Sequence, residues 1–261
     1  MNLGIVQGRL SPPVDNKIQE FPERWKEEFV LLRHFGLNHI EWIFTKKTFP
    51  QNLQLDLRNY SFEINSICCD HLIDKRITDS EFLSKYLRPI CEFALYNNIK
   101  SITIPLLEES KISIAEFSQF TDKMLHYGEI YPELFFCFEM DAPYQLAVEL
   151  AKKSNNFLLT FDTGNITAWG YEPSAYLFAI KKYLANVHLK DFGDYGGIAL
   201  NGSSVRPGEG KTDFDLIFKT LAAINYTGTF TLQTARWKDG YEASTIRQHI
   251  QYFNWHYEKY F

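Results

Sequence analysis

The chain has 261 residues, of which 45% are hydrophobic and 16% aromatic, so it is long enough to bury a sizeable core. Its formal net charge is -5 and it has no basic block, which argues against a nucleic-acid partner. No apolar run reaches the roughly 18 residues that a membrane span needs, and no signal peptide precedes Leu3. The sequence therefore predicts a soluble cytoplasmic protein that does not span a membrane, with its four cysteines as buried free thiols.

Eight short apolar runs are predicted to be β-strands. Each is a continuous hydrophobic stretch instead of a strict alternation, as expected for strands that are covered on both faces. In chain order the predicted strands are Leu3–Gln7, Asn38–Ile43, Phe62–Cys69, Lys100–Pro105, Leu134–Glu139, Phe157–Asp162, Asn186–Lys190 and Thr229–Gln233.

Helical patterns lie between these runs. After Pro22, which suits a first helical turn, Trp25, Phe29 and Leu32 share one face, and Gly36 stands where a C-terminal cap is expected. Capping-box patterns begin two later helices. The remaining expected helices follow Thr78, follow Ser113, span Ala142–Lys152, follow Pro173, begin at Thr212 and include Ile246–Phe253, with a weaker short one over Leu53–Tyr60.

This alternation of strands and helices predicts an α/β fold in which residues 1–261 form a single (β/α)8 TIM barrel, since no Gly/Ser linker divides the chain. A doubly wound open sheet is the structural alternative. Its usual dinucleotide-binding form is removed because no G-x-G-x-x-G follows the first strand, and no phosphate-binding G-x-x-x-x-G-K-[ST] occurs either.

Four predicted strands in the second half carry a side chain that can bind a metal ion at or near their carboxyl ends. These side chains are Glu139, Asp162, His188 and Gln233. Parallel strands carry chemistry at their carboxyl ends, and a carboxylate on an apolar strand must be paired, hydrogen-bonded or bound to a cation. An imidazole among carboxylates suits a borderline divalent ion, whereas the amide of Gln233 binds metal more weakly and cannot accept a proton at neutral pH. A structural salt bridge, or a helix N-cap at Asp162, is the alternative for the two carboxylates, and a hydrogen-bonded core histidine is the alternative for His188.

Charged residues in the loops are candidates for substrate contact. Arg9 follows the first strand and Arg236 the last, and these strands are neighbours in a closed barrel. Guanidinium groups are well shaped for phosphate or carboxylate, although solvated loop charges are the alternative. The other candidates are Glu41, Asp70, Asn165, Asp191 and Arg206, with Lys190 and Asp191 left open between a supporting role and a surface pair.

Several short motifs occur in an informative order along the whole chain. They are GIVQGRLS at 4–11, IEW at 40–42, HLKD at 188–191, GEG at 208–210 followed by DF at 213–214, and LQTAR at 232–236. In this order they resemble the xylose isomerase-like TIM-barrel superfamily and, within it, the sugar-phosphate isomerase/epimerase branch. The superfamily also includes inosose dehydratase and endonuclease IV.

The resemblance implies one divalent ion (Mn, Mg, Zn or Co) held by Glu139, Asp162, His188 and Gln233. Gln233 departs from the family pattern, which has a glutamate there as the second proton carrier of the epimerases. Asn165 stands where many members have a histidine. The implied activity is isomerisation or epimerisation of an anionic sugar or sugar phosphate through an ene-diolate, with Glu139 as the base and Lys190 as an acid or oxyanion partner. The missing carboxylate favours isomerisation or dehydration over 3-epimerisation.

Three other functions remain open at this point. A barrel with a weakened metal site could bind a sugar or sugar acid without turning it over. An abasic-site endonuclease would need more histidine ligands than the seven His of this acidic chain readily provide. A metal-free glycoside hydrolase would need a second, suitably spaced carboxylate. The sequence does not decide between a monomer and a homo-oligomer.

Overall fold

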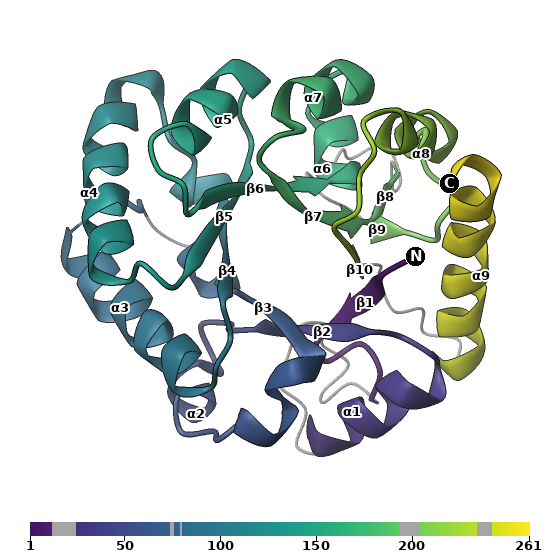
Figure 1. The fold of residues 1–261 in the computed structure, drawn as a ribbon, viewed down its shortest axis with the longest axis horizontal. Coiled ribbons are helices and arrows are strands. Elements are labelled where there is room, and N and C mark those ends of the chain that lie inside the picture. Colours follow the sequence, from purple (N-terminus) through teal and green to yellow (C-terminus); the bar gives the residue numbers. More distant parts are fainter. Residues whose placement is uncertain (12–24, 74–75, 79, 194–203, 234–241) are drawn as a thin grey trace.

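The computed structural model describes residues 1–11, 25–73, 76–78, 80–193, 204–233 and 242–261. Eight parallel strands close into a barrel in the order β1-β10-β7-β6-β5-β4-β3-β2, as Figure 1 shows. The barrel strands are β1 (Leu3–Val6), β2 (His39–Ile43), β3 (Ile64–Cys68), β4 (Ser101–Leu106), β5 (Phe135–Met140), β6 (Phe157–Asp162), β7 (Leu184–Leu189) and β10 (Thr229–Leu232). The predicted (β/α)8 fold is confirmed.

The α-helices surround the barrel as an outer ring (Figure 1). They are α1 (Trp25–His34), α2 (Phe49–Asn52), α3 (Ser80–Tyr96), α4 (Phe117–Ile130), α5 (Tyr144–Ala151), α6 (Thr163–Ala168), α7 (Pro173–Ile180), α8 (Phe214–Ala223) and α9 (Glu242–Tyr260). Aromatic side chains pack between the helices and the strands. For example, Phe218 of α8 stacks on Phe230 of β10 with their ring centroids 5.6 Å apart. Across the described residues, none of the helices combines the length and the apolar character required to cross a bilayer.

One predicted helix, over Leu53–Tyr60, does not form at the predicted position. The weak helix expected over Leu53–Tyr60 is replaced by α2, which begins earlier because Pro50 sits in its first turn, and by a 3-10 helix at Arg58–Glu63. Between them the backbone N–H of Leu57 donates to the side chain of Asn97 at 2.6 Å instead of to a helical carbonyl. A tertiary hydrogen bond therefore overrides the local helical preference.

A two-stranded antiparallel hairpin follows β7 and is not part of the barrel. Its strands are β8 (Asp191–Phe192) and β9 (Ser204–Val205). The segment between β7 and the next helix thus includes a short strand that pairs back onto the residues directly after β7.

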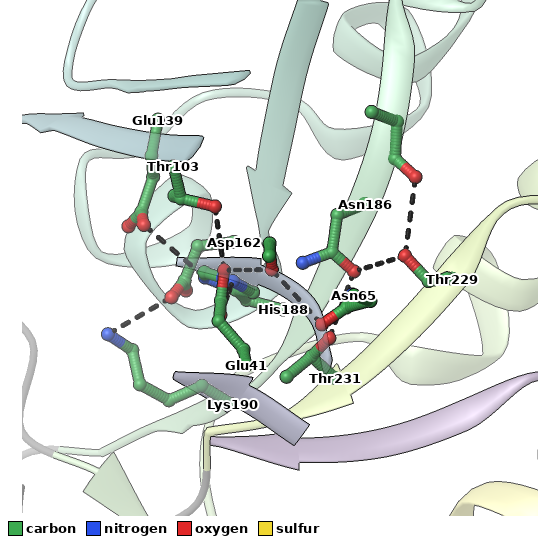
Figure 2. Close-up of polar contacts among 12 residues, drawn as sticks. Glu41, Asn65, Thr103, Glu139, Asp162, Asn186, His188, Lys190, Thr229 and Thr231 are labelled. Atoms are coloured by element: carbon green, nitrogen blue, oxygen red, sulfur yellow. Dashed lines mark hydrogen bonds and ion pairs between the residues drawn. The ribbon is translucent and has the colours of Figure 1, made fainter. Parts of the chain in front are cut away.

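The inside of the barrel is polar at more than one level. At a lower level, His39 Nε2 lies 3.2 Å from the hydroxyl of Thr231, which in turn donates to Asn186 at 3.0 Å. Closer to the carboxyl ends of the strands lies a second polar group around Glu41 and His188 (Figure 2). Buried polar residues of this kind need partners within the barrel, and they determine what the mouth above them can bind.

Candidate metal and substrate site

Three of the predicted ligands converge at the carboxyl ends of neighbouring strands. Glu139 comes from β5, Asp162 ends β6, and His188 lies opposite Asp162 on β7. One donor atom from each of the three lies within 4.8 Å of the others, and all three side chains are buried. This cluster could hold a metal ion, because carboxylate oxygens and an imidazole nitrogen form the donor set that borderline divalent ions prefer.

Asn165 fixes both carboxylates. Its side-chain amide donates to Glu139 Oε1 at 2.6 Å, and its backbone N–H donates to Asp162 Oδ1 at 2.7 Å. Asp162 is therefore the N-cap of α6, which is the alternative role that the sequence suggested for it. Only one of its two carboxylate oxygens accepts the capping hydrogen bond. The other oxygen, Oδ2, lies 3.2 Å from Lys190 Nζ.

Glu41 was expected at the mouth as a substrate-binding residue, and the structure corrects this expectation. Its side chain is fully buried inside the barrel, where Oε2 lies 2.7 Å from His188 Nε2. Oε1 accepts hydrogen bonds from Ser66 at 2.9 Å and from Thr103 at 2.6 Å. Glu41 shares the inward face of β2 with His39, two residues earlier, and pairs with Ser66 of β3 after a register irregularity.

The charges of these buried groups control one another. Burial alone would raise the pKa of Glu41, but the charge and hydrogen bond of His188 and the two hydroxyl donors outweigh it and lower the pKa to about 2. Burial alone would lower the pKa of His188, but Glu41 and Glu139 raise it to about 10. Each group thus favours the charged form of the other.

A cavity of about 430 Å³ opens above the cluster. It is lined by Cys68, Asp70, Ile73, Pro105, Leu107, Glu108, Lys111, Glu139, Asp141, Asn165, Trp169, Lys190 and Gln233. Gln233 directly follows β10, where its backbone N–H donates to Leu189 and its side-chain Oε1 is buried without a hydrogen-bond partner. An amide oxygen that is buried without a partner and belongs to a residue lining the same cavity as Glu139 is a chemically suitable further ligand for a divalent metal ion.

The other predicted substrate residues are placed differently from one another. Asp70, Asn165 and Lys190 line the cavity, as expected. Arg9 is 4% exposed just after β1 and is not among the described lining residues. The Arg206 guanidinium contributes to the low pKa of His249 on α9, after burial as the main cause. Arg236 lies outside the described residues, although its strand does pair with β1.

Asp191 was expected to contact substrate or support the site, and the structure gives it a different task. Its carboxylate is fully buried and accepts four backbone N–H groups. Oδ1 accepts from Phe192 at 2.8 Å and Thr212 at 3.1 Å, and Oδ2 accepts from Gly208 at 2.8 Å and Gly210 at 2.9 Å. Asp191 thus anchors the segment from β9 to α8 onto β8.

Sequence reasoning missed several lining residues of the mouth, among them the charged Glu108, Lys111 and Asp141. Lys111 and Asp141 lie 2.7 Å apart as an ion pair on the rim, and both line the cavity. The position of Asp141 just beyond the end of β5, two residues after Glu139, was the available signal. Lys111 lies in a loop after β4, and nothing in its local sequence indicates that it faces the cavity.

The fold and the site together define a class: a closed parallel barrel with two carboxylates and an imidazole grouped at the carboxyl ends of its strands. Residues 142–253 match the family described as xylose isomerase-like TIM barrel. The chain is similar to this family over these residues, which make up less than half of its length.

Several known proteins are similar to the chain. It is 28% identical to the inosose dehydratase of Bacillus thuringiensis (strain Al Hakam) over 155 residues, which is 50% of this chain and 51% of that protein. It is 40% identical to the putative L-ribulose-5-phosphate 3-epimerase SgbU of Escherichia coli (strain K12) over 73 residues, 28% of this chain and 26% of that one. The matched part thus spans about half or less of these relatives.

Solved structures resemble the chain over its whole length. The IOLI protein with a bound zinc atom has a TM-score of 0.77 at 18% identity, covering 100% of this chain and 99% of that chain. D-psicose 3-epimerase with D-tagatose, from Clostridium cellulolyticum H10, has a TM-score of 0.72 at 14% identity and the same coverage of 100% and 99%. At these identities the likeness shows the fold.

Proposed function

We propose that the chain is an enzyme that uses a divalent metal ion to move a proton next to the carbonyl group of a carbohydrate. The observation that carries this proposal is the convergence of Glu139, Asp162 and His188 within 4.8 Å under a cavity of about 430 Å³. Enzymes of the same superfamily, among them the inosose dehydratase and epimerases named above, support it.

Glu139, Asp162, His188 and Gln233 would hold the ion. A bound divalent ion polarises a carbonyl oxygen and stabilises the negative charge that develops on it. The remaining chemistry belongs to the side chains, and their placement determines which reactions the site suits.

Glu139 is the proposed base. Asn165 holds its Oε1, so the carboxylate has a fixed orientation at the bottom of the cavity. Lys190 reaches the same cavity from β7 and offers an ammonium proton donor beside Asp162. Gln233 cannot take up a proton, so the site has no carboxylate at the end of β10 to serve the opposite face of a substrate. This asymmetry favours transfer on one face, as in aldose–ketose isomerisation or in dehydration, over inversion.

The charge of the described lining favours an uncharged carbohydrate. Four carboxylates (Asp70, Glu108, Glu139 and Asp141) face the cavity, against two ammonium groups. Both ammonium groups, on Lys111 and Lys190, already lie within ion-pair distance of a carboxylate. A sugar phosphate would need cations from outside this lining, for which Arg236 is the sequence-based candidate.

Dehydration of a keto-polyol is therefore the second candidate function. It is favoured by the match to inosose dehydratase over half of the chain and by the acidic lining. It uses the same first step, removal of a proton next to a carbonyl, followed by loss of a hydroxyl group to which Lys190 would give a proton.

The test is proton exchange in deuterated water. Metal-free protein is loaded with Mn²⁺, Mg²⁺, Zn²⁺ or Co²⁺ and incubated with ketoses, ketose phosphates and keto-inositols, and the label is followed by NMR, with Glu139→Gln as the inactive control. Label at one carbon with an aldose product indicates isomerisation, and loss of water indicates dehydration. Inversion at C3 refutes one-face transfer. No metal binding, or no exchange with any of these compounds, refutes the proposed enzyme.

A further inference from the structure

We infer that Glu41 is a positioning residue of the metal centre: it holds His188 in the one ring form that presents Nδ1 to the metal. It also supplies, through that ring, negative charge that Gln233 does not provide. This inference rests on the proposed function and concerns a side chain that lies below the metal site instead of in the cavity.

The geometry around Glu41 leaves little freedom. Its carboxylate is fully buried, and Ser66 and Thr103, from β3 and β4, both aim a hydroxyl at Oε1. Two donors on one oxygen hold the group as an ionised carboxylate with a fixed orientation. The second oxygen, Oε2, is then directed at His188 Nε2, 2.7 Å away (Figure 2).

That contact fixes which nitrogen of His188 keeps its proton. A carboxylate only accepts hydrogen bonds, so Nε2 must donate and must carry a proton. A histidine binds metal through the nitrogen that has no proton, which leaves Nδ1 as the ligand atom. Nδ1 does face the cluster: it lies 3.3 Å from Glu139 Oε2. The ring is therefore held between a carboxylate below it and the metal ligands above it.

The charge of the site supports the same role. The proposed ligand set has two carboxylates, Glu139 and Asp162, and the ammonium of Lys190 lies 3.2 Å from one of them. With neutral His188 and Gln233, these groups have a net charge of only minus one, which is one short of balancing a divalent ion. Glu41 brings the group to minus two. A carboxylate that accepts the far N–H of a ligating imidazole makes that imidazole a stronger donor.

A purely structural ion pair between Glu41 and His188 is the competing explanation. It predicts that loss of Glu41 lowers stability without a specific effect on the metal. The two explanations separate when metal affinity and the ring form of His188 are measured on folded protein.

The experiment compares Glu41→Gln with a matched control, His39→Gln. Both positions lie on β2 and are buried inside the barrel, but His39 contacts Thr231 at the lower level instead of His188. Glutamine keeps the size of Glu41 and an oxygen for Ser66 and Thr103, and replaces the charged oxygen that faces His188 Nε2 with a neutral amide N–H donor. Metal-free proteins, checked for folding by circular dichroism, are titrated with Zn²⁺ alone by competition calorimetry. We expect Glu41→Gln to bind Zn²⁺ about 10- to 100-fold more weakly than the wild type, and His39→Gln to bind it as the wild type does.

A second measurement needs no variant. In Zn²⁺-loaded wild-type protein labelled with ¹⁵N-histidine, Nε2 of His188 should be protonated and Nδ1 metal-bound, with the signal assigned by its loss in His188→Asn. Coordination through Nε2, or unchanged affinity in folded Glu41→Gln, overturns the inference and leaves the proposed function standing. A wild-type protein that binds no divalent metal overturns both.

Discussion

The substitution Asp191→Asn tests whether Asp191 is a loop anchor, as the structure indicates, or a substrate ligand, as the sequence led us to expect. Its two carboxylate oxygens accept four backbone N–H groups, two each. Asparagine keeps one oxygen and replaces the other with an amide that donates, so two N–H groups would face another donor. The new side chain has little room to move away from these N–H groups, because the site is tightly packed: a Cβ on Gly210 would lie 2.2 Å from Asp191 Oδ1.

The expected cost follows from these contacts. Leaving a buried donor unsatisfied costs about 1–3 kcal/mol, so two of them should cost about 3 kcal/mol after partial relaxation. In a chain of this size that corresponds to a fall in Tm of about 6 to 12 °C. The same change at Asp213, the exposed N-cap of α8 whose side chain accepts from the Leu216 N–H, is the matched control. Asparagine caps helices as well as aspartate does, so Asp213→Asn should change stability by under about 0.5 kcal/mol.

The assay is urea unfolding followed by circular dichroism, together with Zn²⁺ titration of each folded variant. We expect Asp191→Asn to lower the free energy of unfolding while the folded fraction binds Zn²⁺ as the wild type does. Unchanged stability combined with loss of carbohydrate binding would show that the four hydrogen bonds are unimportant and that the sequence-based role was right.

Three further outcomes are expected. First, burial lowers the pKa of His39 from its usual 6.5 to about 4. The neutral ring therefore contributes its full stability above about pH 6.5, and this contribution is lost as the pH falls toward 4. Wild type should therefore lose about 1 kcal/mol more than His39→Gln between about pH 7 and about pH 5.5 in urea unfolding, and parallel curves for the two proteins would contradict this. Second, Gln233→Glu should bind Mn²⁺ at least about tenfold more tightly in calorimetry, because a carboxylate replaces a neutral ligand; equal affinity would place Gln233 outside the ligand set. Third, treatment with a chelator should lower the Tm of metal-loaded protein by an amount that depends on metal concentration, and a Tm indifferent to added metal would show that no ion binds the folded state.

The barrel was predictable because each strand is a continuous apolar run between helical patterns. The run that ends at Asp162, for example, became β6 with the predicted limits. The convergence of Glu139, Asp162 and His188 was predictable for the same reason, since polar side chains stand out against apolar strands. The short helix α2 was not, because a tertiary contact from Asn97 determines the backbone at Leu57.

The role of Glu41 could not be read from the sequence. In a strand that is buried on both faces, alternation does not show whether a polar residue points into the barrel or toward its mouth. Its partners Ser66, Thr103 and His188 come from three other strands, so its environment is set by contacts far apart in the sequence. The structural role of Asp191 was also not predictable, because the two-residue strand β8 in which it lies is too short to show a periodic pattern.

The pairing of Glu41 with His188 limits how this chain can change over generations. A descendant that discards the imidazole would strand a carboxylate in the middle of the barrel, with two hydroxyl groups still oriented toward it. Such a descendant would fold less stably. Loss of the proposed metal ligand is thus linked to a cost in stability, which a branch without it could relieve only by also changing Glu41.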